Sequence, residues 1–180
     1  LWGTLINGYT ELGFYEKALK CWDQIVLEDM FPDVVISVGI LKACAALGDL
    51  GKGWDVHRFI VEKMLETKTM VGNALVHMYA KCGSLEDSQE VFDDLPRRDV
   101  VSWTSLITGY ARHGLCDRAI HCFDGLQRNG VQHDEITLIC ILKVSGKIGA
   151  VNKGYEVHAE IVREGLLRKS GNSLANALVE

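Results

Sequence analysis

Five glycines recur at a nearly constant spacing and constrain the fold more than any other feature of the chain. They are separated by 35, 35, 31 and 35 residues: Gly13, Gly48, Gly83, Gly114 and Gly149. A small residue follows each glycine five positions later, and these residues are Ala18, Gly53, Ser88, Ala119 and Gly154. An apolar pair precedes each glycine in the same phase. These three features keep the same relative positions even where the spacing falls from 35 to 31 residues. Such a pattern predicts internal structural repeats.

Each repeat unit is expected to contain two helices. A glycine directly after a helical apolar pattern can end the helix in the left-handed conformation. In the unit 100–134 this places the helices near 103–113 and 116–129, on either side of Gly114. A pair of helices this short cannot bury its apolar face alone, so successive pairs must stack. The sequence therefore predicts an all-α fold, a right-handed α-solenoid of stacked helix-turn-helix repeats.

Composition narrows the class of protein. The 180 residues are 48% hydrophobic and 24% charged, which is typical of a chain that folds in water. No run of about 18 uncharged apolar residues occurs, so we expect no membrane association. The six cysteines form no C-x-x-C motif and are expected to be buried free thiols rather than metal ligands or disulfides. The chain starts at Leu1 and not at Met, and we interpret it as a piece of a longer protein.

One short motif suggests catalysis and needs an explanation. The segment KGYEVHAEIV at 153–162 contains His-x-Glu, the first half of the zinc deaminase signature. A near-copy, KGWDVHRFIV, lies 101 residues earlier at 52–61, and there the histidine is followed by Arg58 and Phe59. The second half of the signature, P-C-x-x-C, occurs nowhere in the chain. The histidines, His57 and His158, are therefore predicted to be packing residues, and we expect no metal, no cofactor, no small-molecule substrate and no enzyme activity in these residues.

The repeat units resemble those of pentatricopeptide repeat proteins, in particular the plant-type subclass that cycles through P, L and S units. NALVHMYAKCGSLEDSQEVFDDLPRRD at 73–99 is similar to the short S unit, and DVVSWTSLITGYARHGLCDRAIHCFDGLQRNG at 99–130 is similar to a P unit. LKACAALGDLGKGWDVH and LKVSGKIGAVNKGYEVH resemble L units. The resemblance divides one array into a partial P unit, L, S, P and L units and the start of an S unit: 1–33, 34–68, 69–99, 100–134, 135–171 and 172–180.

The resemblance implies binding of single-stranded RNA, at roughly one base per repeat. In the family pattern the fifth and last residues of a unit read one base. Asn73 with Asp99 matches the uracil-preferring pair, and Thr104 with Asp134 matches the guanine-preferring pair. A carboxylate suits the N–H donors of guanine, and an amide can both donate and accept. Asn176 occupies a further uracil-like position.

Two more sets of residues carry over from the family pattern. The second residue of a unit sandwiches the bases, and the apolar residues there are Val35, Met70, Val101 and Ile136. The thirteenth residue can meet the phosphates, and the basic residues there are Lys81, Arg112 and Lys147. They would form a basic row in spite of the net charge of −5. The alternatives are that the first set belongs to the core and the second is a solvated face favoured by the helix dipole.

Some units depart from the reading pattern. The first unit has Gly3 at the reading position and Asp33 as its last residue, so base choice there is in doubt. The L units have apolar Val38 and Ile139 at the fifth position, and these units are expected to contribute spacing and stacking. The aspartates at the unit ends also lie where a helix N-cap is expected, and the two roles can coexist.

Family resemblance implies that the parent protein acts on transcripts in a mitochondrion or chloroplast. Arrays of this subclass commonly direct RNA editing or processing, with editing-complex proteins as partners and in some members a C-terminal cytidine deaminase domain. No such domain occurs in these residues, so the fragment would carry recognition only. The alternative hypothesis is a protein-interaction solenoid of the tetratricopeptide type, which has a period of about 34 residues and another consensus.

Overall fold

The structure is a computed structural model that describes residues 1–28, 30–65, 68–163 and 165–166. These described residues form ten α-helices and no strand. The chain divides into two compact parts, Leu1–Arg97 and Arg98–Glu180, which are described separately below as the first part and the second part.

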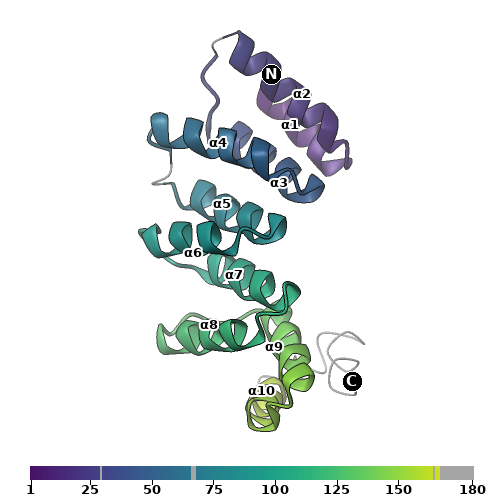
Figure 1. The fold of residues 1–180 in the computed structure, drawn as a ribbon, viewed down its shortest axis with the longest axis vertical. Helices are drawn as coiled ribbons and strands as arrows, with labels where there is room; N and C mark the ends of the chain where they lie inside the picture. The colour runs from purple at the N-terminus through teal and green to yellow at the C-terminus, as the bar shows by residue number, and fades with distance from the viewer. Residues whose placement is uncertain (29, 66–67, 164, 167–180) are drawn as a thin grey trace. The chain divides into compact units, whose positions relative to one another are not determined.

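The first part contains three helical hairpins in chain order. They are α1 (Trp2–Glu11) with α2 (Tyr15–Leu27), α3 (Val34–Leu47) with α4 (Leu50–Glu62), and α5 (Thr69–Cys82) with α6 (Leu85–Asp94). The first helices stack on one another, because α3 packs against both α1 and α5, and the second helices α2 and α4 pack against the first helix that follows (Figure 1).

The second part repeats this arrangement with two hairpins. They are α7 (Val100–Arg112) with α8 (Cys116–Arg128) and α9 (Glu135–Ile148) with α10 (Val151–Arg163). Helix α9 packs against α7, α8 and α10, so the first helices are again neighbours. The prediction of an all-α fold built from stacked helical hairpins is therefore confirmed.

The repeat glycines do what their spacing predicts. All five have positive φ angles, from 68° to 84°, and Gly48, Gly83 and Gly149 are the C-caps of α3, α5 and α9. This backbone conformation is strained for residues with a Cβ, so glycine ends each first helix at low cost. The next helix then turns back at once and makes the hairpin.

The small residues of the second helices allow close packing. Ala18, Ser88 and Ala119 are fully buried. A Cβ added to Gly53 of α4 would lie only 2.5 Å from Sδ of Met78 in α5. Bulky residues fill the core at the positions that His57 and His158 occupy in their own units, nine residues after the repeat glycine: Trp22, Phe92 and Phe123.

One ion pair occurs in both parts at equivalent positions. Lys52 Nζ of α4 lies 2.7 Å from Asp23 Oδ1 of α2, and Lys153 Nζ of α10 lies 2.7 Å from Asp124 Oδ1 of α8. The two lysines are 101 residues apart, as are the two aspartates. Each pair joins the second helices of adjacent hairpins, and the hydrogen bond to Asp23 raises the pKa of Lys52.

Helix boundaries differ from the sequence prediction in one instructive place. Helix α7 begins at Val100 and not near residue 103. Asp99 accepts a hydrogen bond from the backbone N–H of Ser102, and the Ser102 hydroxyl accepts one from the backbone N–H of Asp99. This capping box satisfies backbone donors at the helix start and extends the helix to the aspartate.

Among the described residues, no helix combines the length and the apolar character needed to cross a membrane. In the same residues, no group of three or more His, Cys, Asp and Glu side chains could hold a metal ion. The six cysteines are free thiols. Burial raises the pKa of Cys44 to about 12 and that of Cys140 to about 11.

Candidate nucleic-acid interface

The three unit-ending aspartates are all helix N-caps. Asp33, Asp99 and Asp134 precede α3, α7 and α9, and one carboxylate oxygen of each accepts a hydrogen bond from the backbone N–H three residues later at 2.8–3.0 Å. The N-cap interpretation is therefore confirmed. One oxygen is sufficient for the cap, so the second oxygen of each carboxylate can take part in another interaction.

The second part brings Thr104 and Asp134 together. Thr104 projects from α7, and its hydroxyl donates to Asp134 Oδ2 at 3.2 Å. The hydroxyl of Thr137, in the first turn of α9, lies 2.7 Å from that of Thr104 and also donates to Asp134 Oδ1 at 2.7 Å. Thr104 and Asp134 are both half-buried. The two residues predicted to read one base are thus direct neighbours, with a buried hydroxyl behind them.

The equivalent residues in the first part are Gly3 and Asp33, and Gly3 has no side chain that could read a base. A Cβ added to Gly3 would lie 3.7 Å from Cγ1 of Ile36 and 3.8 Å from Cγ1 of Val35, so Gly3 faces the first turn of α3. Asp33 caps that helix and is exposed. Of these two residues, only Asp33 offers a side-chain polar group.

Asn73 is more buried than a base-reading residue should be. It lies in α5 with 9% of its surface exposed. Its predicted partner, Asp99, belongs to the second part of the chain. The pairing therefore stays a prediction, and the burial of Asn73 is a property that its place in the repeat does not reveal. Asn176 lies outside the described residues.

The predicted base-sandwiching residues are exposed apolar side chains. Each is the second residue of a first helix, and the exposed fractions are 45% for Val35, 63% for Met70, 52% for Val101 and 61% for Ile136. The alternative that these residues belong to the core is therefore wrong. Exposed apolar side chains at the start of four helices are costly in water, and stacking against bases would cover them.

The predicted phosphate-contacting residues are exposed cations in the last turns of first helices. Lys81, Arg112 and Lys147 lie in the last turns of α5, α7 and α9 respectively. This place is also favoured by the helix dipole, so the solvated-face alternative stays open.

In the second part, stacking and basic residues line one hollow. The hollow has a volume of about 350 Å³ and lies between α7 and α9. Its lining includes Ile136 at one end, Arg112, Lys143 and Lys147, and an apolar wall that contains Ile139. A surface that combines an apolar side chain with several cations can accept a base and its phosphate.

Lys143 was missed by the sequence reasoning. It is exposed and lines the same hollow as Lys147, which lies one helical turn later in α9. A signal was present, because Lys42 occupies the same place in the first L-like unit, 101 residues earlier. The position does not belong to the family pattern that was carried over, so it was not considered.

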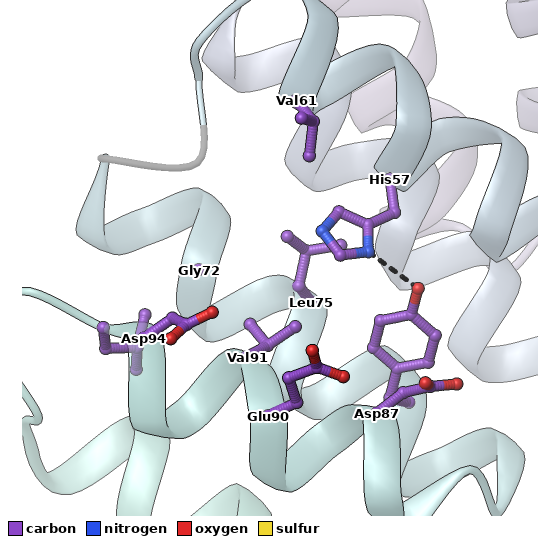
Figure 2. A pocket seen from close by; sticks show the side chains of 10 residues that line it. His57, Val61, Gly72, Leu75, Asp87, Glu90, Val91 and Asp94 are labelled. Atoms are coloured by element: carbon purple, nitrogen blue, oxygen red, sulfur yellow. Dashed lines mark hydrogen bonds between the residues drawn. The ribbon is translucent and has the colours of Figure 1, made fainter.

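A second hollow, in the first part, has the opposite charge. It has a volume of about 320 Å³, and its walls come from α4, α5 and α6 (Figure 2). Three carboxylates of α6 border it, those of Asp87, Glu90 and Asp94. Phosphate groups would be repelled there, so this hollow does not fit a nucleic-acid backbone.

The histidine in this hollow is structural. His57 Nδ1 lies 2.8 Å from the hydroxyl of Tyr79, and the two rings meet edge to face with centroids 5.6 Å apart. Figure 2 shows the imidazole directed at the phenol oxygen. Burial, with a smaller effect of Asp87, raises the pKa of Tyr79. The packing role of His57 is confirmed, whereas the prediction that His158 is a packing residue is wrong, because its side chain is exposed on α10.

Known proteins share both the sequence pattern and the fold. Models of the PPR repeat family match residues 98–147, and PPR repeat models match residues 1–30 and 73–100. Two Arabidopsis thaliana pentatricopeptide repeat-containing proteins, At5g27110 and the chloroplastic At4g25270, are each 36% identical over 160 and 178 residues, or 89% and 99% of this chain. The chain spans 23% and 33% of the length of these relatives.

Solved structures agree with the fold. The maize pentatricopeptide repeat protein PPR10 in complex with an 18-nt psaJ RNA element has a TM-score of 0.76 at 19% identity, covering 98% of this chain and 27% of that chain. The PPR domain of Arabidopsis thaliana protein-only RNase P 1 in complex with tRNA has a TM-score of 0.74 at 15% identity, covering 96% and 92%. On the combined evidence of repeat pattern, helical hairpins and these matches, the chain belongs to the pentatricopeptide repeat family.

Proposed function

We propose that the chain binds single-stranded RNA and selects bases through its first helices. The observation that carries the proposal is the hydrogen-bonded pair of Thr104 and Asp134, which lies next to exposed Ile136. In the hollow beside Ile136, Arg112 and Lys147 supply positive charge. Polar groups for a base edge, an apolar surface for its face and cations for its phosphate are thus available within one pair of first helices.

Similar proteins support this proposal. The solved relatives with the same fold are named for complexes with an RNA element and with tRNA. The roles of the reading, sandwiching and phosphate-contacting residues are carried over from the family pattern and are part of the proposal. We assign guanine to the pair Thr104 and Asp134 and uracil to the pair Asn73 and Asp99, with lower selectivity at Gly3.

The parent protein is proposed to be an organellar RNA-editing or RNA-processing factor of the P-L-S subclass. Several relatives are named as chloroplastic proteins, which supports localisation of the parent protein in an organelle. Any catalytic step would come from a domain of the parent or from an editing-complex protein. The described residues then act as the recognition part.

The test is a change of base preference and not merely a loss of binding. Replacing Thr104→Asn makes the Thr–Asp pair an Asn–Asp pair, and the amide brings separate donor and acceptor atoms, as in the pair assigned to uracil. Fluorescence anisotropy with short labelled RNAs would measure affinity for four oligonucleotides that differ only at the base assigned to this pair. We expect the wild-type chain to prefer guanine there and the variant to prefer uracil.

A matched control introduces the same amide elsewhere. His121→Asn places it on the exposed face of α8, away from the first helices, and should leave base preference unchanged. If the wild-type chain binds all four RNAs equally, or none, base reading is refuted. A protein-interaction solenoid would then be the better interpretation.

A further inference from the structure

A buried hydroxyl lies behind the base-reading pair of the second part. Thr137 is the third residue of α9, and none of its surface is exposed. Its hydroxyl contacts Asp134 Oδ1 and Thr104 Oγ1, both at 2.7 Å. Because it is buried, Thr137 cannot touch an RNA base, yet it contacts both residues that are proposed to do so.

The direction of each hydrogen bond follows from counting protons. The carboxylate of Asp134 can only accept when it is ionised, and each threonine hydroxyl has one proton to donate. Oxygens 2.7 Å apart need a hydrogen between them, so Thr137 gives its proton to Asp134 Oδ1. Because the oxygens of Thr104 and Thr137 are also 2.7 Å apart, Thr104 gives its proton inward, mainly to Thr137, and Asp134 Oδ2 at 3.2 Å is the weaker second acceptor.

The consequence concerns what Thr104 can offer to a base. With its proton directed inward, its oxygen presents lone pairs only, and the neighbouring Asp134 carboxylate also presents lone pairs. Two adjacent acceptors match a base edge with two adjacent donors. Guanine has such an edge, the N1–H and the N2 amino group, whereas the pairing edges of adenine, cytosine and uracil set a donor beside an acceptor.

We propose that Thr137 is a positioning residue that keeps the Thr104 hydroxyl an acceptor and so sets the preference of this repeat for guanine over adenine. The inference rests on the proposed function and adds a determinant that lies inside the helix stack. It assigns specificity to a side chain in the hairpin that follows the reading residue.

The other unit ends provide a contrast. Ser102 has the same place in α7 relative to Asp99, but its hydroxyl donates to the backbone carbonyl of Asp99 at 2.9 Å. At α3 the same place is taken by Ile36, which has no hydroxyl. A hydroxyl that donates to the capping carboxylate is thus seen at α9 and not at α3 or α7.

The experiment compares variants at the buried position. Thr137→Val removes the hydroxyl with little change of shape, Thr137→Ser keeps the hydroxyl, and Ser102→Ala removes the hydroxyl at the contrasting site. Anisotropy titrations would use two RNAs that differ only by guanine or adenine at the base assigned to Thr104. The measured quantity is the ratio of the two dissociation constants.

We expect Thr137→Val to reduce the guanine-over-adenine ratio by about fivefold or more, because a correctly paired base edge is worth that discrimination. Thr137→Ser should retain the wild-type ratio, and Ser102→Ala should not change the ratio at this base. A purely structural role would weaken both RNAs equally and leave the ratio unchanged, and that result would overturn the inference.

If Thr137→Val does not fold, as judged by circular dichroism, Thr137→Ala provides the same test without the branched side chain. Two outcomes with the wild-type chain are also decisive. If the wild-type chain binds RNA but has no guanine preference at this base, the inference fails while RNA binding stands. If the wild-type chain binds no RNA, the proposed function fails, and the inference fails with it.

Discussion

The salt dependence of RNA binding should report the number of cations that meet phosphates. Arg112 and Lys147 line the hollow between α7 and α9, and Lys143 lines the same hollow. Replacing the first two together by glutamine keeps a polar side chain at each position but removes two positive charges. The predicted quantity is the slope of log K against log salt concentration, because this slope counts contacts between cations and phosphates.

The magnitude follows from counterion release. Each phosphate contact on a single strand contributes about −0.7 to the slope of log K against log salt. The variant Arg112→Gln with Lys147→Gln should therefore have a slope less steep by about 1.4. Between about 50 mM and about 200 mM salt, the wild-type chain should lose about sevenfold more affinity than the variant. Adding Lys143→Gln should lower the slope by about 0.7 more if this lysine also meets a phosphate.

The assay is anisotropy of one labelled RNA over a series of potassium chloride concentrations. The matched control is Arg128→Gln, which removes an exposed cation from the last turn of α8 and not from a first helix. We expect the wild-type slope for this control. An unchanged slope in the double variant, or an equal change in the control, would refute the assignment of phosphate contacts to Arg112 and Lys147.

Three further predictions concern stability and can be checked by urea unfolding. Gly53→Ala places a Cβ 2.5 Å from Met78 Sδ, an overlap that should cost about 1–3 kcal/mol against a gain of about 0.5–1 kcal/mol when alanine replaces a helical glycine. Gly51→Ala in the same helix meets no atom closer than 3.7 Å and should show the gain alone. Phe123→Ala empties a fully buried site and should cost about 3–5 kcal/mol; a loss below about 1 kcal/mol would contradict its core role. Because burial raises the pKa of the Cys44 thiol to about 12, the folded chain keeps a proton that the unfolded chain loses at lower pH. The contribution of Cys44 to the free energy of unfolding should therefore be constant below about pH 8 and fall as the pH rises above that value, and Cys44→Ala should make the alkaline fall in stability less steep.

The hairpins could be predicted from sequence because their signals are local and repeated. A glycine such as Gly114 ends a helix through its own backbone, and its effect is visible in the chain without knowledge of any neighbour. The start of α7 was placed three residues late because the apolar pattern was followed from Trp103. The capping box between Asp99 and Ser102 adds a turn in which Val101 is exposed and the fully buried residue, Ser102, is polar, so the apolar pattern does not extend into it.

The candidate site was less accessible to sequence reasoning because its properties depend on adjacent helices. The repeat position of Asn73 matches that of Thr104, but its exposure does not. The role inferred for Thr137 requires three oxygens from two helices within hydrogen-bond distance. Lys143 could be recognised as a candidate phosphate contact only from its position in the hollow between α7 and α9.

The ion pairs of Lys52 with Asp23 and of Lys153 with Asp124 suggest how such a chain could be lengthened or recombined. Each pair ties one hairpin to the hairpin before it, and both recur with the same offset as the surrounding sequence. A block of repeats exchanged with that offset would keep a lysine that pairs with the aspartate of the preceding hairpin. Base-reading residues on the first helices could then be exchanged between chains without loss of the ion pairs between second helices.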